Sequence, residues 1–143
     1  MNTADLANDR HLILDTLARY AWGFDEADFD LLADTFTEDA STGGKVSHTD
    51  IGWGPLVGRA QIVEVLTAIR NSQTDQRRHS LHTPRFHSQT EKSADVSVYT
   101  TILGSESRQT RVVTTGWYRA ALVKQVDGAW RLKSLEALLD SPF

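Results

Sequence analysis

The sequence contains no cysteine, which excludes disulfide bonds and thiolate metal sites. It has no apolar run close to the roughly 20 residues that a membrane-spanning helix needs. Its amino-terminal stretch, MNTADLANDRH, lacks the apolar core of a signal peptide. These absences predict a soluble, cytoplasmic protein without disulfide bonds and without a membrane partner.

The chain also has fewer basic than acidic residues. The chain carries 15 Lys and Arg against 19 Asp and Glu, a formal net charge of -4 at pH 7. Because binding to nucleic-acid phosphates requires a basic surface, this balance argues against a nucleic-acid partner. There is no Gly-x-Ser-x-Gly motif for a nucleophilic serine. Gly52, Gly54 and Gly58 fit neither the dinucleotide-binding nor the P-loop spacing, so we interpret them as turn residues.

The length and the apolar patterns of the chain indicate one α+β domain over residues 1–143. This length is typical of a single domain. Apolar residues at helical spacing predict an amphipathic helix over about 6–24, a short helix over 29–34 and a third helix after Gly58. Between the second and third helices, residues 38–55 are rich in Gly, Ser, Thr and Asp. This composition predicts a strand followed by a long loop.

In the second half the period changes to two. Residues 96–103 and 112–121 alternate and are rich in β-branched and aromatic residues, so both are predicted strands. Asp127-Gly128 predicts a tight hairpin before a last strand that begins at Trp130. Helices followed by an antiparallel meander indicate the α+β class, with helices covering one face of a strongly twisted sheet.

Several short stretches occur in an order that resembles a known family: Arg19-Tyr20, Phe24-Asp25, Asp28, Phe36-Thr37-Glu38-Asp39-Ala40, Gly58-Arg59-Ala60-Gln61-Ile62, Arg77-Arg78-His79, Gly116-Trp117-Tyr118 and Asp127-Gly128-Ala129-Trp130-Arg131-Leu132. In this order the chain is similar to the SnoaL-like proteins of the nuclear-transport-factor-2-like superfamily. Relatives include scytalone dehydratase, bile acid 7α-dehydratase, ketosteroid isomerase, polyketide cyclases and the β subunits of ring-hydroxylating dioxygenases. The resemblance spans nearly the whole chain. It implies a cone-shaped fold in which amino-terminal helices pack on a strongly curved, mostly antiparallel sheet that encloses a pocket.

The resemblance also implies a catalytic group at the open end of the cone, where Tyr20, Asp25 and His79 match a Tyr, an Asp and a His of the dehydratase branch. Histidine suits proton transfer because its charge changes near working pH. A carboxylate that binds the ring fixes its tautomer, and a tyrosine hydroxyl can stabilise an enolate as it forms. We therefore expect Asp25 and His79 within hydrogen-bonding distance inside the pocket.

Each of these three residues also has a purely structural explanation. Asp25 could cap the second helix, since Asp is a favoured cap residue. His79 could be a strand histidine that is simply buried and hydrogen-bonded. Tyr20 lies on the apolar stripe of the first helix and could belong to the core.

Glu136 is a further catalytic candidate. If no bulge intervenes, it shares a face with Trp130 and Leu132 and points into the cone. A lone carboxylate there is costly unless it is paired or protonated, so it could act as a second acid or base. The alternative is that a bulge turns Glu136 outward. The residues expected to contact the substrate are Trp22, Phe24, Trp53, Leu66, Ser97 and Tyr99.

No metal and no cofactor is expected. His79 and His82 lie on opposite faces of a regular strand, and Pro84 interrupts the strand before His87. The leading hypothesis is a cofactor-independent dehydratase, isomerase or cyclase acting on a hydrophobic small molecule such as a polyketide, steroid or terpenoid-like compound. The alternatives are a non-catalytic ring-hydroxylating dioxygenase β-type subunit and a small-ligand-binding protein.

The combination of Tyr20, Asp25 and His79 favours the enzyme, because a purely structural subunit does not need it. We also expect a homodimer. The outer sheet face carries Val113, Thr115 and Trp117, or their alternates, and is more apolar than a solvated face requires. The resemblance implies the same arrangement.

Overall fold

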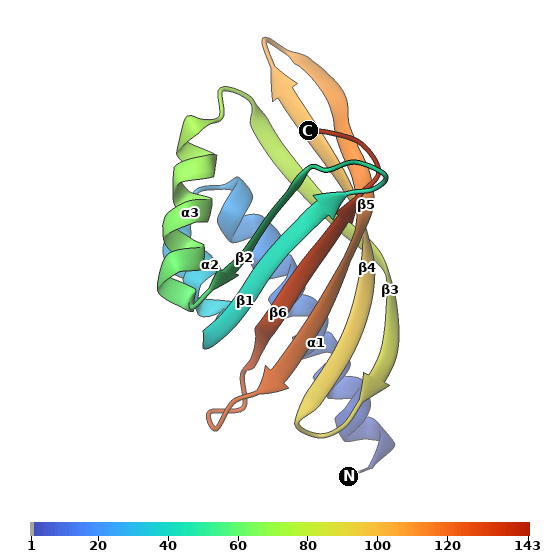
Figure 1. Ribbon diagram of the computed structural model, residues 1–143. Helices are drawn as coiled ribbons and strands as arrows, with labels where there is room; N and C mark the ends of the chain where they lie inside the picture. Colours follow the sequence, from blue (N-terminus) through green and yellow to red (C-terminus); the bar gives the residue numbers. More distant parts are fainter. Residues whose placement is uncertain (1) are drawn as a thin grey trace.

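The computed structural model describes residues 2–143 and contains three helices and six strands (Figure 1). In chain order these are α1 (Thr3–Asp25), α2 (Phe29–Asp34), β1 (Phe36–Val46), β2 (Gly52–Val57), α3 (Arg59–Ser72), β3 (Gln76–Gln89), β4 (Ser93–Glu106), β5 (Gln109–Lys124) and β6 (Trp130–Leu139). The region expected to be one strand and a long loop instead forms two paired strands, β1 and β2. None of the helices described is long and apolar enough to cross a membrane.

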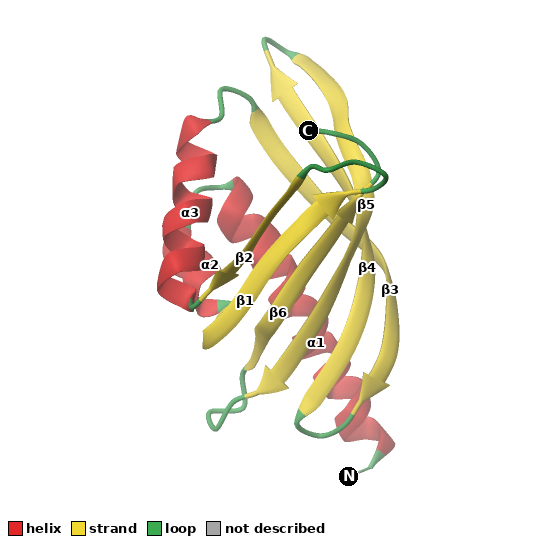
Figure 2. Cartoon of the chain, in the orientation of Figure 1, coloured by secondary structure: helices red, strands yellow, loops and turns green. Residues whose placement is uncertain are grey.

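The six strands form one curved, open sheet in the order β2-β1-β6-β5-β4-β3. β1 and β6 run parallel, and the other neighbouring pairs are antiparallel. The helices lie on one face of this sheet, with α1 crossing behind it and α3 beside β1 and β2 (Figure 2). The predicted α+β class and the strongly curved, mostly antiparallel sheet are therefore confirmed.

Helix α1 packs on the inner face of the sheet along a buried stripe of Ile13, Leu17, Tyr20 and Phe24. These residues recur every three or four positions, which places them on one side of a helix. The short helix α2 is capped by Asp28, whose side chain accepts a hydrogen bond from the Leu31 amide. Because Asp28 is the cap, the carboxylate of Asp25 is available for other contacts.

Strand β6 contains a bulge that decides where Glu136 points. Leu132 pairs with Leu122, but Ser134 pairs with Ala121, so Lys133 is one extra residue in β6. An extra residue reverses the facing of everything after it. Leu135 is consequently buried and Glu136 exposed. The prediction that Glu136 points into the cone is wrong, and the bulge alternative is correct.

Strand β5 has an irregularity of the same kind. Thr114 pairs with Ile102 whereas Val112 pairs with Leu103, which leaves Val113 unpaired and buried. Val113 was expected on the outer face with Thr115 and Trp117, and this part of the prediction is wrong. Val112, its alternate, is exposed instead.

Candidate active site

A cavity of about 360 Å³ lies between the helices and the inner face of the sheet. This volume lies within the range of small-molecule binding pockets. Most of its wall is apolar. The polar side chains that line it are Tyr20, Thr42, Gln73, Arg77, His79 and Tyr118.

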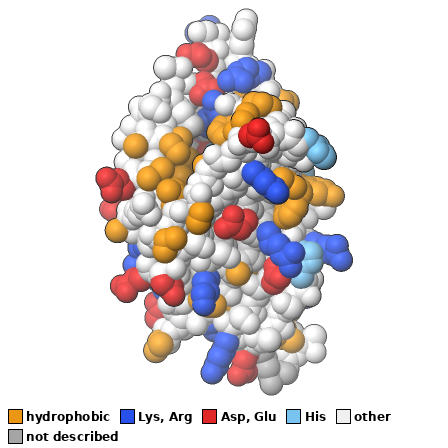
Figure 3. All heavy atoms as spheres, viewed as in Figure 1, with side chains coloured by type: hydrophobic (Ala, Val, Ile, Leu, Met, Phe, Trp, Pro, Cys, Tyr) orange, Lys and Arg blue, Asp and Glu red, His pale blue; other side chains and the backbone are white. Residues whose placement is uncertain are grey.

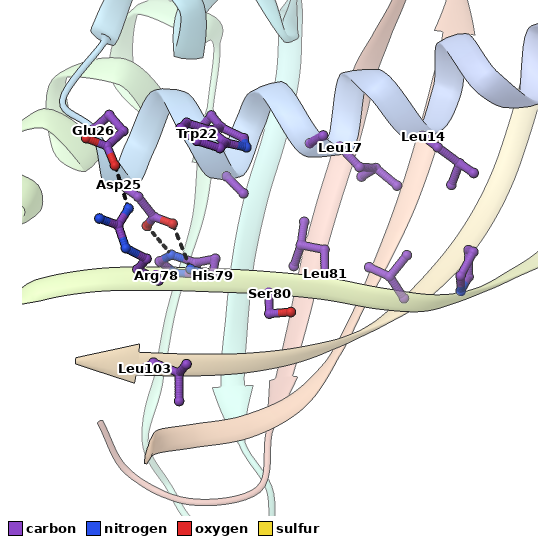
Figure 4. Close-up of a pocket in the computed structure, with 14 residues that line it drawn as sticks. Leu14, Leu17, Trp22, Asp25, Glu26, Arg78, His79, Ser80, Leu81 and Leu103 are labelled. Atoms are coloured by element: carbon purple, nitrogen blue, oxygen red, sulfur yellow. Dashed lines mark hydrogen bonds and ion pairs between the residues drawn. The ribbon is translucent and has the colours of Figure 1, made fainter. Parts of the chain in front are cut away.

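His79 of β3 lines this cavity and contacts Asp25 of the last turn of α1 behind it, on the side of a neighbouring hollow that both residues line (Figure 4). The His79 backbone N–H donates to Asp25 Oδ2 at 2.7 Å, and His79 Nδ1 lies 2.6 Å from Asp25 Oδ1. Both side chains are only 8% exposed. The expected hydrogen bond is therefore present, and the two contacts fix the imidazole ring against one carboxylate.

This contact also determines the tautomer of His79. An ionised carboxylate only accepts hydrogen bonds, so Nδ1 carries the proton and Nε2 of the neutral ring has the lone pair. Within residues 2–143, Nε2 makes no hydrogen bond. Phe24 stacks on the ring, with ring centroids 5.3 Å apart and an interplanar angle of 25°. The ring of His79 is thus held by Asp25 at Nδ1 and by stacking with Phe24, and the residue lines the cavity.

Two buried tyrosines, Tyr20 on α1 and Tyr118 on β5, lie in the same cavity, with ring centroids 6.4 Å apart. Burial raises the pKa of Tyr20 well above its ordinary value, and the nearby Tyr118 and Asp25 raise it further. Burial also raises the pKa of Tyr118, with a smaller contribution from Asp25. Both phenols therefore remain protonated at neutral pH and can donate hydrogen bonds to a ligand oxygen.

A second hollow of about 570 Å³ lies outside the cavity, between α1 and the edge strand β3. Figure 4 shows Trp22 and Leu17 of α1 facing Leu81 of β3 across it. Glu26 and Arg78 form an ion pair at one end. His79 lines both the hollow and the inner cavity.

The other predicted substrate contacts divide into two groups. Phe24, Trp53 and Leu66 line the cavity. Trp22 does not; it is 65% exposed and lines the outer hollow. The inner face of β4 carries buried residues such as Val98 and Thr100, and Ser97 and Tyr99 alternate with them. Ser97 and Tyr99 consequently lie on the outer face, which corrects their predicted placement.

Glu136 lines a shallow depression on the outer face with Trp117 and Lys45. His82 and His87 are also turned outward, where they contact Thr101 and Ser97 respectively. Among the residues described, no group of three or more His, Asp or Glu is placed to hold a metal ion.

The sequence interpretation missed two polar residues of the cavity, Tyr118 and Arg77. Both could have been found by alternation. Tyr118 follows the outward-facing Trp117, and Arg77 lies two residues before His79 on the same strand face.

Helices packed on one face of a curved, open, mostly antiparallel sheet are the architecture of a cystatin-like α+β protein. The SnoaL-like domain family matches residues 5–136, and the chain belongs to this family. No curated protein matches the chain.

Solved structures share the fold. A protein of unknown function with a cystatin-like fold from Nostoc punctiforme is 19% identical, with a TM-score of 0.79 over 94% of this chain and 92% of that one. A protein from Catenulispora acidiphila, solved in complex with S-DNPA, is 25% identical, with a TM-score of 0.77 over 93% and 94%. The β subunit of a putative aromatic-ring-hydroxylating dioxygenase from Novosphingobium aromaticivorans is 15% identical, with a TM-score of 0.79 over 96% and 92%.

Proposed function

We propose that the protein is a cofactor-independent acid–base enzyme, a dehydratase, isomerase or cyclase, that acts on a hydrophobic small molecule. One observation carries the proposal: Asp25 holds the ring of His79 through Nδ1, and His79 lines a cavity that two protonated tyrosines also line. A base and hydrogen-bond donors in one apolar enclosure are what proton abstraction beside a carbonyl requires.

The proposed chemistry begins with a neutral His79. Nε2 removes a proton from the carbon next to a substrate carbonyl, and the electron pair of that C–H bond moves onto the carbonyl oxygen. Tyr20 and Tyr118 donate hydrogen bonds to this oxygen as it becomes negative. Asp25 stabilises the imidazolium, which returns its proton to a leaving hydroxyl in a dehydration or to another carbon in an isomerisation.

The character of the cavity supports a hydrophobic substrate. Its lining includes Phe24, Trp53, Leu66 and Leu135. Burial of an apolar ring system against these side chains would therefore lower the free energy of binding. Exclusion of water would also strengthen the hydrogen bonds to a developing oxyanion. The Catenulispora acidiphila protein, solved with S-DNPA, supports a small organic ligand. A polyketide, steroid or terpenoid-like compound fits this description.

Deuterium exchange tests the proposal before the product is known. Hydroxylated polycyclic ketones are incubated with the protein in D₂O, and mass spectrometry follows uptake of deuterium beside the carbonyl. His79→Ala should reduce the exchange rate on the order of 10²–10⁴-fold, because it removes a positioned general base. Asp25→Asn should act in the same direction, since the ring loses its charged partner.

The matched control is His82→Ala, on the same strand but on the outer face, which should exchange at the wild-type rate. If His79→Ala retained the wild-type rate on a responsive ketone, the assignment of the base would be overturned.

A second candidate is a non-catalytic role, as a dioxygenase β-type subunit or as a binding protein. The shared fold with the β subunit from Novosphingobium aromaticivorans favours it. In this case ketones would bind in the cavity, but the wild type would exchange deuterium no faster than His79→Ala does.

We further propose that two copies associate through the outer face of the sheet. Tyr99 on β4 is 55% exposed, and Val112 and Trp117 on the neighbouring strand β5 are 61% and 37% exposed; Trp117 pairs with Tyr99. Large side chains exposed together are typical of an interaction surface.

A further inference from the structure

Arg77 is the one residue with a permanent charge that lines the inner cavity, among the residues described. It lies two positions before His79 on β3 and pairs with Gly104 of β4, as His79 pairs with Ile102. Arg77 and His79 therefore share the inner face of the sheet. No Asp or Glu side chain from residues 2–143 lines this cavity.

A buried carboxylate holds Arg77 in place. Its Nε donates to both oxygens of Asp75, at 3.0 and 2.9 Å. Gly104 makes room for that carboxylate, since a Cβ there would lie 2.5 Å from Asp75 Oδ2. Within residues 2–143, neither terminal nitrogen of Arg77 donates a hydrogen bond. The side chain is positioned through Nε, and its remaining donors are unused.

The charges around Asp75 do not cancel. Arg111 also donates to Asp75 Oδ2, at 3.3 Å, so a single carboxylate is shared by two guanidinium groups. The group of Arg77, Asp75 and Arg111 therefore carries one more positive than negative charge, and Arg77 is its member that lines the cavity. Gln73 lines the same cavity, and its Oε1 is buried without a hydrogen-bond partner among the residues described. The unused guanidinium donors of Arg77 are the groups that an acceptor oxygen of a ligand would satisfy, whereas Gln73 Oε1 would require a donor.

We propose that Arg77 is a specificity-determining residue that binds an acidic oxygen of the substrate, a carboxylate or an equally acidic enol. This inference rests on the proposed function, because it takes the cavity to be the substrate site. An anion enters an apolar cavity only where it is paired. A guanidinium whose two terminal nitrogens keep four free N–H donors pairs well with a planar carboxylate. The substrate class is thus an apolar ring compound that carries an acidic group.

Two isosteric probes test this directly by isothermal titration calorimetry at pH 7.5 and 150 mM salt. They are 2-naphthoate, which carries a carboxylate, and 2-acetylnaphthalene, which is neutral and lacks a donor. The wild type should bind naphthoate at least about tenfold more tightly, the effect of a charge-assisted pair in a low-dielectric site. Arg77→Gln should remove this preference and leave the affinity for acetylnaphthalene within about twofold.

Arg111→Gln is the matched control, because Arg111 contacts the same carboxylate from outside the cavity and is 62% exposed. It should retain the preference for naphthoate. The double variant Asp75→Asn/Arg77→Gln removes both buried charges and serves if Arg77→Gln alone does not fold. Equal affinity of the wild type for the two probes, or a preference that survives loss of Arg77, overturns the inference. Neither result affects the deuterium-exchange test of His79, so the two proposals fail separately.

Discussion

At the scale of single residues, the Asp25–His79 pair explains how a carboxylate is kept in the interior. A buried charge is costly unless each of its oxygens has a partner. Oδ2 of Asp25 accepts from the backbone amide of His79, and Oδ1 accepts from the ring of the same residue. One strand position therefore satisfies both oxygens. Any displacement of β3 relative to α1 would disturb the backbone contact and the ring contact together.

The raised pKa of Tyr118 predicts a loss of stability in alkaline solution. In the unfolded chain a tyrosine ionises near pH 10, whereas burial first, and then Asp25, hold the phenol of Tyr118 protonated in the folded protein. Unfolding above pH 10 thus releases a proton, and the free energy of unfolding falls as pH rises. Tyr118→Phe removes this proton. Its free energy of unfolding, measured in urea from pH 8 to 11.5, should fall about 1 kcal/mol less per pH unit above pH 10.

The comparison at pH 8, below tyrosine ionisation, supplies the baseline for the packing effect of that substitution. Parallel curves for wild type and Tyr118→Phe up to pH 11.5 would show that Tyr118 is not held protonated.

At the scale of elements, helix α1 is attached to the sheet near both of its ends by buried aspartates. Near its amino terminus, Asp9 accepts from Lys124 Nζ of β5 at 3.2 Å and from Trp130 Nε1 of β6 at 3.1 Å. At its carboxyl terminus, Asp25 binds His79 of β3. The contact through Asp9 thus sets the position of the helix that carries Tyr20 and Asp25.

Asp9→Ala should destabilise the protein by about 1–3 kcal/mol, because the Trp130 N–H would be left buried without an acceptor. Lys124 contributes less, since its side chain is 33% exposed and can reach water. The measurement is the midpoint and slope of urea unfolding. Asn8→Ala, at an exposed position of the same helix turn, is the control and should change stability little. A loss for Asp9→Ala no larger than for the control would contradict the role given to Asp9.

The helices and strands also show which features could be predicted from the sequence. The short helix was expected at 29–34, where α2 lies, because its apolar spacing is local information. The outward facing of Ser97 and Tyr99 could also have been predicted from the sequence. Val96 and Val98 alternate with them, and branched apolar residues prefer the interior. The bulge at Lys133 could not have been predicted from the sequence, because it depends on how β6 pairs with β5.

At the scale of the whole molecule, the outer face of the sheet differs in chemical character from the mostly apolar cavity on its inner face. Viewed from that side, hydrophobic side chains are interspersed with basic, acidic and histidine side chains (Figure 3). Trp117 lies next to Tyr99 in the pairing of β4 and β5. A mixed surface of this kind is compatible with an association of moderate size rather than with a fully apolar interface.

The proposed dimer predicts that Trp117→Lys yields a monomer. In a twofold contact the substitution acts on both copies at once and places two like charges in the interface. Analytical ultracentrifugation at micromolar concentration should show a dimer for the wild type and a monomer for the variant. Val126→Lys, in the fully exposed β5–β6 connection, should remain dimeric. A monomeric wild type at this concentration would refute the association itself.

The sequence by itself determined the α+β class, the buried stripe of α1 and the candidates Tyr20, Asp25 and His79, because each follows from a local period or from residue order. Only the tertiary structure decided that Glu136 faces outward and that residues of α1, β3 and β5 line one cavity. Strand facing depends on a bulge that shifts the period by one residue, and pairing depends on which strands become neighbours. The hydrogen bonds of Asp75 to Arg77 and of Asp25 to His79 form only once the chain is folded, since the burial that makes them matter is a property of the whole molecule.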